Sequence, residues 1–155
     1  MGNASAERAS IAINAPIEVV WSIFTDVEHW PTWASSFTSV ELLDGPMRLG
    51  AKARIRQPRL PTVLWEVTRW EPGQSWTWAT TSPGARTEAS HVLTRSGEST
   101  IAEQSISSSG PLGRLAAFVW RSLTRRYLAI EAAGLKQRSE QMAGASRAAA
   151  AVPAR

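Results

Sequence analysis

The sequence predicts an α+β fold in which a sheet of six to seven antiparallel strands is followed by one long helix lying across one of its faces. Three observations lead to this prediction. Residues 37–107 consist of short apolar runs separated by turn residues, and connections this short favour antiparallel neighbours. Residues 111–141 form the one segment with the length and period of a long helix. A chain of 155 residues that is 43% hydrophobic suits a single domain with a real core.

The first strand is expected at residues 10–14, where Ile11 and Ile13 share one face. Pro16 then suits the first turn of a helix. This helix carries an apolar stripe at helical spacing, made of Ile17, Val20, Trp21 and Phe24. A further turn or short helix is expected within residues 27–33. Two short helices therefore follow the first strand.

Six more strands are expected between successive Gly, Pro, Asp and Ser turns. Their predicted ranges are 37–43, 50–57, 62–70, 74–81, 86–95 and 99–107. In the second of these strands Lys52, Arg54 and Arg56 alternate with apolar residues. This period of two indicates the solvated face of a strand, with an anionic partner surface as the alternative.

On a helical wheel, residues 111–141 have one apolar side. Burial of that side against the sheet would hold the helix in place. The residues on that side are Leu112, Leu115, Ala116, Val119, Leu123, Tyr127, Ile130, Ala133 and Gly134. Arg126 interrupts the pattern, because it lies about 40° from the centre of the apolar side at about 100° per residue.

Residues 1–8 are expected to be flexible, residues 9–142 to form one ligand-binding domain and residues 143–155 to be a disordered tail. Neither a signal peptide nor an apolar run long enough to span a membrane is recognisable, so a cytoplasmic location is expected. The chain has no cysteine, which excludes disulfides and a thiol nucleophile.

Several classes of function are not supported by the sequence. The net charge of +4 is only mildly basic and no nucleic-acid-binding module is recognisable, so no nucleic acid is expected as a partner. The sequence contains no Gly-rich phosphate loop, no metal-ligand spacing and no G-x-S-x-G motif. We therefore expect neither a cofactor nor a metal.

Two positions could carry acid–base chemistry. If the hairpin at Ser96-Gly97 pairs Leu93 with Ile101, His91 stands opposite Glu103, and this pair could act as acid or base. If the register slips by one residue, His91 faces Gln104 instead and the pair is lost.

Arg126 and its neighbour Tyr127 are the other candidates. The Arg126 guanidinium could enter a cavity and hold an anionic ligand group, while Tyr127 donates a hydrogen bond. The alternative is that Arg126 extends from the helix edge into water.

A cavity between sheet and helix is itself predicted, because several late strand positions hold small residues, among them Ala89, Ala102 and Ser105. The eight tryptophans could line it, although plain core packing is the alternative for each. The residues expected to contact a ligand are Trp33, Phe37, Trp65, Trp76, Trp78, Val119 and Leu123.

These segments resemble a known family. The opening run from Ala15 to Trp33, with Trp30-Pro31-Thr32-Trp33 at its end, is similar to that of the START-like, SRPBCC helix-grip superfamily, in its bacterial polyketide cyclase/dehydrase and lipid-transport branch. Further agreement comes from residues 65–73, from the Ser82-Pro83-Gly84 turn and from Gly110-Pro111-Leu112-Gly113. The resemblance covers about residues 8–140 and implies a curved antiparallel sheet wrapped around the C-terminal helix, with an apolar ligand held between them.

The resemblance leaves two functions open. The first is a protein that binds a small hydrophobic or aromatic ligand, such as a polyketide, lipid or isoprenoid. The second is a polyketide cyclase or dehydrase (aromatase/cyclase), in which His91, Glu103, Arg126 and Tyr127 act on a poly-β-keto substrate held in the same cavity. A third possibility is an interaction surface, because Phe118 and Leu128 lie off the apolar side and Trp120 lies at its edge. A monomer or a homodimer is compatible with each.

Overall fold

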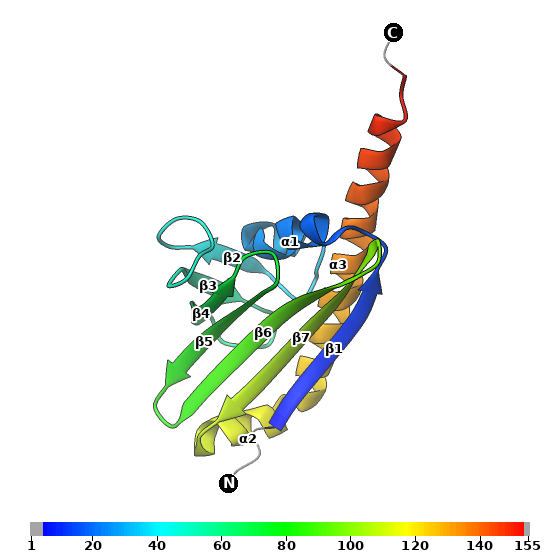
Figure 1. The fold of residues 1–155 in the computed structure, drawn as a ribbon. Coiled ribbons are helices and arrows are strands. Elements are labelled where there is room, and N and C mark those ends of the chain that lie inside the picture. Colours follow the sequence, from blue (N-terminus) through cyan, green and yellow to red (C-terminus); the bar gives the residue numbers. More distant parts are fainter. Residues whose placement is uncertain (1–4, 154–155) are drawn as a thin grey trace.

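The computed structural model describes residues 5–153 and shows a seven-stranded antiparallel sheet in the order β1-β7-β6-β5-β4-β3-β2 (Figure 1). The fold class is therefore the α+β helix-grip arrangement that the sequence predicts. The strands are β1 (Ser5–Ile13), β2 (Ser39–Leu42), β3 (Lys52–Arg56), β4 (Val63–Glu71), β5 (Ser75–Ser82), β6 (Ala85–Ser96) and β7 (Ser99–Ser109).

The helices lie on one side of the sheet. Two short ones, α1 (Ile17–Thr25) and the 3-10 helix η1 (Val27–Thr32), follow β1, as predicted. The C-terminal part of the chain forms α2 (Pro111–Val119) and α3 (Arg121–Ala150). Figure 1 shows α3 running behind the sheet and extending past its end. No helix in residues 5–153 is long and apolar enough to cross a membrane.

The strands expected in residues 37–107 all form, with their ends displaced by a few residues. The alternating charges of β3 are confirmed as a solvated face, because Lys52, Arg54 and Arg56 are exposed while Ala53 and Ile55 are buried. Two expected boundaries differ. Residues 5–8, predicted to be flexible, belong to β1, and the predicted tail contributes residues 143–150 to α3, with Ala143 buried.

The single helix expected over residues 111–141 is two helices. The break falls at Trp120, where φ is −98° and ψ is 12°. The two helices rest on different surfaces: α2 sits on β6 and β7, with Gly113 against Ala85, whereas α3 packs along β1 and α1. A straight helix cannot follow both surfaces.

The break also makes the predicted apolar side wrong in part, although Tyr127 and Gly134 are buried as expected. Leu112, Leu115 and Val119 are exposed, and so is Ala133. The buried positions of α3 are Tyr127, Leu128, Glu131, Ala132, Gly134, Leu135, Ser139 and Ala143. Leu128, expected off the apolar side, is among them. The buried positions differ from the predicted ones because a helical wheel assumes one uninterrupted helix, and this segment is two helices.

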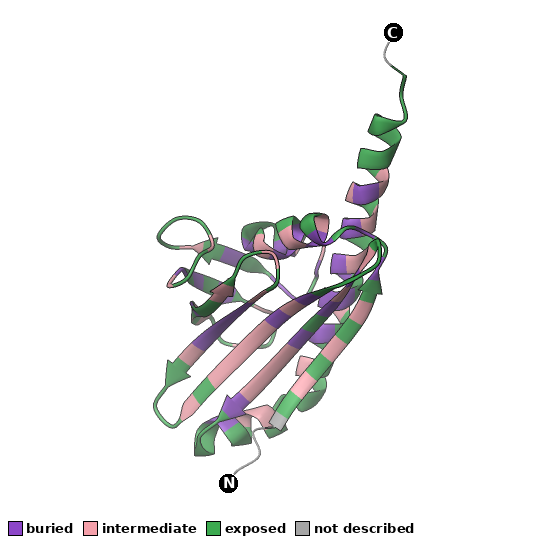
Figure 2. Ribbon diagram, in the orientation of Figure 1, coloured by how far each residue is buried: buried purple, intermediate pink, exposed green. Residues whose placement is uncertain are grey.

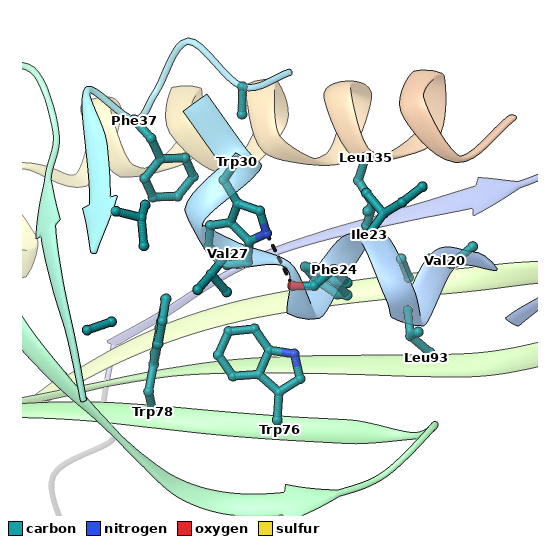
Figure 3. Packing of buried hydrophobic residues seen from close by; sticks show 14 of the residues in the cluster. Val20, Ile23, Phe24, Val27, Trp30, Phe37, Trp76, Trp78, Leu93 and Leu135 are labelled. Atoms are coloured by element: carbon teal, nitrogen blue, oxygen red, sulfur yellow. Dashed lines mark hydrogen bonds between the residues drawn. The ribbon is translucent and has the colours of Figure 1, made fainter. Parts of the chain in front are cut away.

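An aromatic core joins α1 and η1 to the middle of the sheet (Figure 3). Trp30 from η1 is buried and lies 5.9 Å from Trp76 and 5.5 Å from Trp78, measured between ring centroids. Its indole nitrogen donates to the Phe24 carbonyl. Figure 2 shows buried residues on the strands and along α3 where it lies behind the sheet, whereas the last turns of α3 are exposed. Trp30 is therefore placed at the centre of the fold, and it separates this core from the pocket described next.

Candidate functional site

A pocket lies between the sheet and the first turns of α3. About 560 Å³ free of protein atoms, part of it open to solvent, is bounded by β3 to β7, by the loop after β3 and by α3. The apolar wall consists of Trp30, Phe37, Ile55, Leu60, Trp65, Trp78, Ala89, Ile106 and Leu128. The polar residues are Gln57, His91, Gln104, Ser105, Thr124, Tyr127 and Glu131. An apolar pocket with a few converging polar groups is the usual form of a small-molecule site.

Glu131 is the acidic side chain of α3 that lines this pocket, and it is 7% exposed. Ser36 donates to its Oε1 at 3.1 Å and Gln104 donates to its Oε2 at 3.2 Å. Burial raises the pKa of the carboxyl group to about 8, and these two hydrogen bonds only partly oppose the change. At neutral pH the group is thus mostly a neutral acid, which can donate a hydrogen bond.

His91 lies on β6 directly between Trp76 on β5 and Gln104 on β7. Its ring stacks on the Trp76 indole, with centroids 3.8 Å apart and planes 13° from parallel. Burial lowers the pKa of the imidazole to about 3, so the ring is neutral. Its Nδ1 and the Gln104 Oε1 are buried without a hydrogen-bond partner among the described residues. We call His91, Gln104 and Glu131 the polar cluster of the pocket.

The expected pairing of His91 with Glu103 is wrong. The β6–β7 hairpin turns through Gly97 and Glu98 and pairs Ser96 with Ser99, so Leu93 faces Ala102 and His91 faces Gln104. Gly97 has φ of 61°, as expected for the first residue of a tight two-residue hairpin loop. Glu103 pairs with Val92 and is exposed. A shift of one residue has turned its side chain to the outer face.

Arg126 does not reach the pocket either. It is exposed and lies in a surface groove beside Arg59 and Trp120. This is the alternative in which the cation extends into water. Val119 and Leu123, expected to contact a ligand, line the same groove and not the pocket.

Tyr127 lies on the inner side of α3 and lines the pocket. Its hydroxyl donates to the carbonyl oxygen of Pro58, in the loop after β3. The hydroxyl thus fastens this loop to α3 at the edge of the pocket. Tyr127 can shape the entrance of the pocket, but its hydroxyl proton is already used in the hydrogen bond to Pro58.

Of the aromatic residues expected to contact a ligand, some line the pocket and others do not. Phe37, Trp65 and Trp78 line the pocket. Trp76 instead lies behind His91 in the core, and Trp33 lies on the far side of α3, where its carbonyl faces Gly134.

Trp30, Gln104 and Glu131 were missed as site residues. Gln104 was considered only as the partner of His91 in the rejected register. Glu131 carried a usable signal, because it follows Tyr127 by four residues and therefore shares its helix face.

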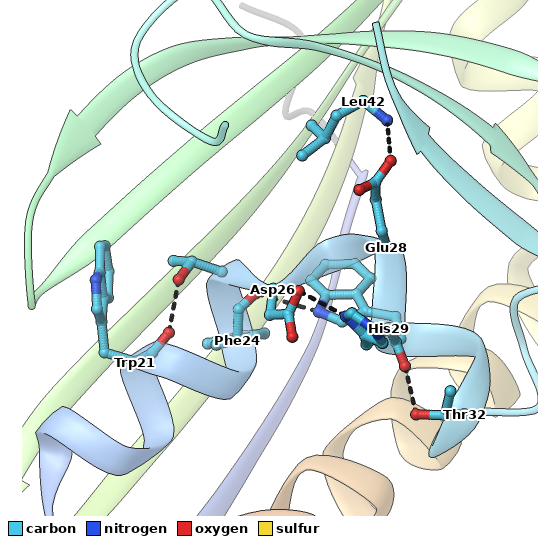
Figure 4. A network of polar contacts seen from close by, with 9 residues as sticks. Trp21, Phe24, Asp26, Glu28, His29, Thr32 and Leu42 are labelled. Carbon is cyan, nitrogen blue, oxygen red and sulfur yellow. Dashed lines mark hydrogen bonds and ion pairs between the residues drawn. The ribbon is translucent and has the colours of Figure 1, made fainter. Parts of the chain in front are cut away.

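The short helix that supplies Trp30 is held by polar contacts on its outer side (Figure 4). Asp26 Oδ1 lies 2.8 Å from His29 Nδ1, and Glu28 accepts from the backbone N–H of Leu42 at 3.0 Å. The Asp26 carboxylate raises the pKa of His29. This histidine is exposed and is not among the residues that line the pocket.

Residues 5–153 contain no group of three or more His, Asp or Glu side chains placed to hold a metal ion.

Comparison with known proteins identifies the family. The family model described as polyketide cyclase / dehydrase and lipid transport matches residues 7–140. The chain belongs to this family. The match confirms the resemblance drawn from the opening helices and turns.

Individual relatives agree with this assignment. A Streptomyces halstedii protein named "Putative polyketide cyclase" is 34% identical over 68 residues, which are 44% of this chain and 52% of the relative. The chain thus spans about half the length of the curated relative that it matches.

Solved structures show the same fold. A START superfamily protein from Mycobacterium smegmatis has a TM-score of 0.69 at 16% identity, covering 90% of this chain and 99% of that one. The di-domain ARO/CYC StfQ from the steffimycin biosynthetic pathway has a TM-score of 0.73 at 11% identity, covering 91% of this chain and 52% of that one. The family and fold suit hydrophobic ligand binding or polyketide cyclase activity.

Proposed function

We propose that the protein binds a small aromatic or otherwise apolar molecule, bearing at least one polar oxygen, in the pocket between the sheet and α3. The single observation that carries this proposal is the polar cluster at the wall of an otherwise tryptophan-rich pocket. Buried polar atoms without partners cost free energy, about 1–3 kcal/mol each. A ligand hydroxyl that donates to Gln104 Oε1, or a carbonyl that accepts from neutral Glu131, would recover part of this cost.

The aromatic wall supports the same proposal. Trp65 and Trp78 lie 5.7 Å apart, measured between ring centroids, and Trp30 closes the pocket on the side of η1. Flat aromatic side chains favour a flat ligand, because stacked and edge-to-face contacts add to the burial of apolar area. The polyketides and lipids in the family's description both present apolar surface.

The test begins with the freshly purified protein, denatured in organic solvent so that any bound small molecule can be identified by mass spectrometry. Direct binding is then measured with 1-naphthol and with naphthalene, which differ only in the hydroxyl group. We expect 1-naphthol to bind about tenfold more tightly, corresponding to about 1.4 kcal/mol for the polar cluster. Equal affinities would show that the polar cluster does not contribute to ligand binding. If neither compound binds, the pocket is not a binding site for such ligands.

Tryptophan fluorescence locates the ligand. Trp78→Phe is expected to reduce the response to 1-naphthol, since Trp78 is one of three tryptophans that line the pocket, with Trp30 and Trp65. Trp70→Phe is the matched control, because Trp70 packs on Trp21 at 5.3 Å, outside the pocket. A response lost in the control and kept in Trp78→Phe would place the ligand elsewhere.

A second candidate function is polyketide cyclisation in the same pocket, and the neutral carboxyl of Glu131 favours it. A neutral acid can donate a hydrogen bond or a proton to a ligand carbonyl as that oxygen gains negative charge during enolisation. His91 lies at the same wall as the available proton acceptor, and its pKa of about 3 makes it a weak base there. Holding a poly-β-keto chain in one folded shape would supply much of the remaining rate enhancement.

Glu131→Gln separates the two functions. The amide keeps the hydrogen-bonding shape and cannot transfer a proton at neutral pH. If the protein is a cyclase, turnover of a poly-β-keto thioester should fall at least about 100-fold, as expected for the loss of a general acid, while 1-naphthol affinity changes little. Turnover that is unaffected by the substitution would exclude Glu131 as the acid.

A further inference from the structure

Helix α2 turns its small residues to the sheet and its large apolar residues to solvent, the reverse of the usual arrangement. Its small residues face the sheet: Gly113 is buried, and a side chain there would lie 3.4 Å from Ala85. Its large apolar residues face outward, and Phe118 is 75% exposed. We call this outward face, with the residue that follows the helix, the α2 surface; it consists of Leu112, Leu115, Phe118, Val119 and Trp120. Exposed apolar area of this kind usually marks a contact site.

The α2 surface is bordered by positive charge. From residue 111 to residue 130 the chain has four arginines and no acidic residue. Arg121 and Arg125 share one partner, the Glu7 carboxylate, which leaves an excess of positive charge. Arg114, Arg126 and the nearby Arg59 have no carboxylate within ion-pair distance in residues 5–153. An apolar helix face bordered by arginines is the pattern of helices that lie in an anionic membrane surface.

The α2 surface also lies next to the pocket. Val119 and Trp120 share a groove with Arg59, and the next residue in that loop, Leu60, lines the pocket. On the helix side the groove residue Leu123 is followed by Thr124, which lines the pocket as well. A bilayer in contact with the α2 surface would therefore lie beside the pocket wall formed by the loop after β3 and the start of α3.

We propose that the α2 surface docks this protein onto anionic lipid membranes, with Leu115, Phe118 and Val119 inserted among the acyl chains and the arginines on the headgroups. A second copy of the chain is the other occupant to consider. A two-fold contact through this surface would place each copy's arginines near those of its partner, and like charges oppose such a contact. An anionic membrane neutralises them instead. Docking of this kind needs no ligand in the pocket.

The experiment is sedimentation with vesicles of phosphatidylcholine alone and of phosphatidylcholine mixed with phosphatidylglycerol. The full chain should bind the mixed vesicles, bind the neutral ones at least about tenfold more weakly, and dissociate as salt is raised. The double variant Leu115→Ser/Phe118→Ser should bind the mixed vesicles at least about tenfold more weakly, since both side chains are exposed and their loss leaves the core intact.

The matched control is Leu49→Ser/Leu64→Ser, which removes two exposed leucines outside α2 and should leave vesicle binding unchanged. Size-exclusion chromatography of all three proteins completes the test. Absence of vesicle binding, or equal binding by both variants, would overturn the proposal. A dimer that Leu115→Ser/Phe118→Ser dissociates, without vesicle binding, would show that the α2 surface pairs two copies. Binding of 1-naphthol, measured on the same variants, reports on the pocket independently.

Discussion

The His91 imidazole lies flat on the Trp76 indole, 3.8 Å from it between ring centroids, at the point where the aromatic core meets the pocket. The stack leaves the ring little access to water, and His91 is 4% exposed. A protonated imidazole would have to remain buried here with no carboxylate of the described residues bonded to its Nδ1. The neutral ring is therefore part of the folded state.

This stack predicts how stability depends on pH in the acid range. The pKa of His91 falls from 6.5 to about 3 on folding, so the unfolded chain binds a proton that the folded chain does not. Stability from this group is complete above pH 6.5 and falls by about 1.4 kcal/mol per pH unit below it. His91→Phe keeps an aromatic ring and removes the proton, so its urea-unfolding free energy should depend less on pH between pH 6.5 and 4 than that of the unchanged protein.

His29 is the control for that experiment. It is exposed and its pKa is raised by Asp26, so its contribution has the opposite sign: it is present at low pH and lost as pH rises through the pKa of the folded state. His29→Asn should leave the acid-side loss of stability in place. If His91→Phe and the unchanged protein follow parallel curves, the imidazole does not have the lowered pKa described here.

Glu131 predicts a loss of stability on the alkaline side. Its pKa rises from 4.5 to about 8 on folding, so the folded state holds a proton that the unfolded state releases. Stability from this group is complete below pH 4.5 and falls by about 1.4 kcal/mol per pH unit as pH rises towards 8. Between pH 4.5 and 6.5 the two buried groups oppose each other. Above pH 6.5 Glu131 is the buried group of the pair that still contributes, and the exposed His29 adds a change of the same sign.

Urea unfolding of Glu131→Gln between pH 6.5 and 8 tests this prediction. The amide does not titrate, so we expect most of the alkaline decline of the unchanged protein to be absent, with the contribution of His29 remaining. Glu140→Gln is the comparison on the same helix: Lys136 lowers the pKa of that carboxylate, so its removal should not flatten the alkaline side. A decline that persists in Glu131→Gln would assign it to another group.

The positions of the strands could be predicted from the sequence, because they depend on residues close together in the chain. Gly, Pro and Asp turns fix where a strand ends, and alternation fixes which face is wet, as at Lys52 and Arg54. Register and helix phase were harder. The Ser96-Gly97 turn admitted two pairings that differ by one residue, and that residue decides whether Glu103 or Gln104 faces His91.

The prediction of which helix residues face the sheet was wrong for a related reason. The break at Trp120 depends on two docking surfaces that only the assembled sheet provides, so the wheel placed Val119 and Leu123 towards the ligand. Glu131 was passed over because an acidic residue on a helix is normally solvated. Its burial depends on Ser36 and Gln104, which lie 95 and 27 residues away in the chain. Contacts at such separations are not visible in local patterns.

Gly134 gives a last prediction, which tests how closely α3 is seated on the rest of the fold. A Cβ atom at this position would lie 2.3 Å from the carbonyl oxygen of Trp33 and 2.9 Å from its ring. The helix and the segment after η1 would have to separate, so Gly134→Ala should destabilise the protein by about 2–3 kcal/mol, although alanine favours a helix.

Gly144 is the matched control on the same helix, because a Cβ atom there would meet nothing within 4 Å. Gly144→Ala should stabilise the protein, by up to about 1 kcal/mol, through helix propensity alone. Urea-unfolding midpoints of the two variants should therefore move in opposite directions. A stabilising Gly134→Ala would mean that α3 lies farther from Trp33 than described, and the pocket that both helix and segment bound would then be wider.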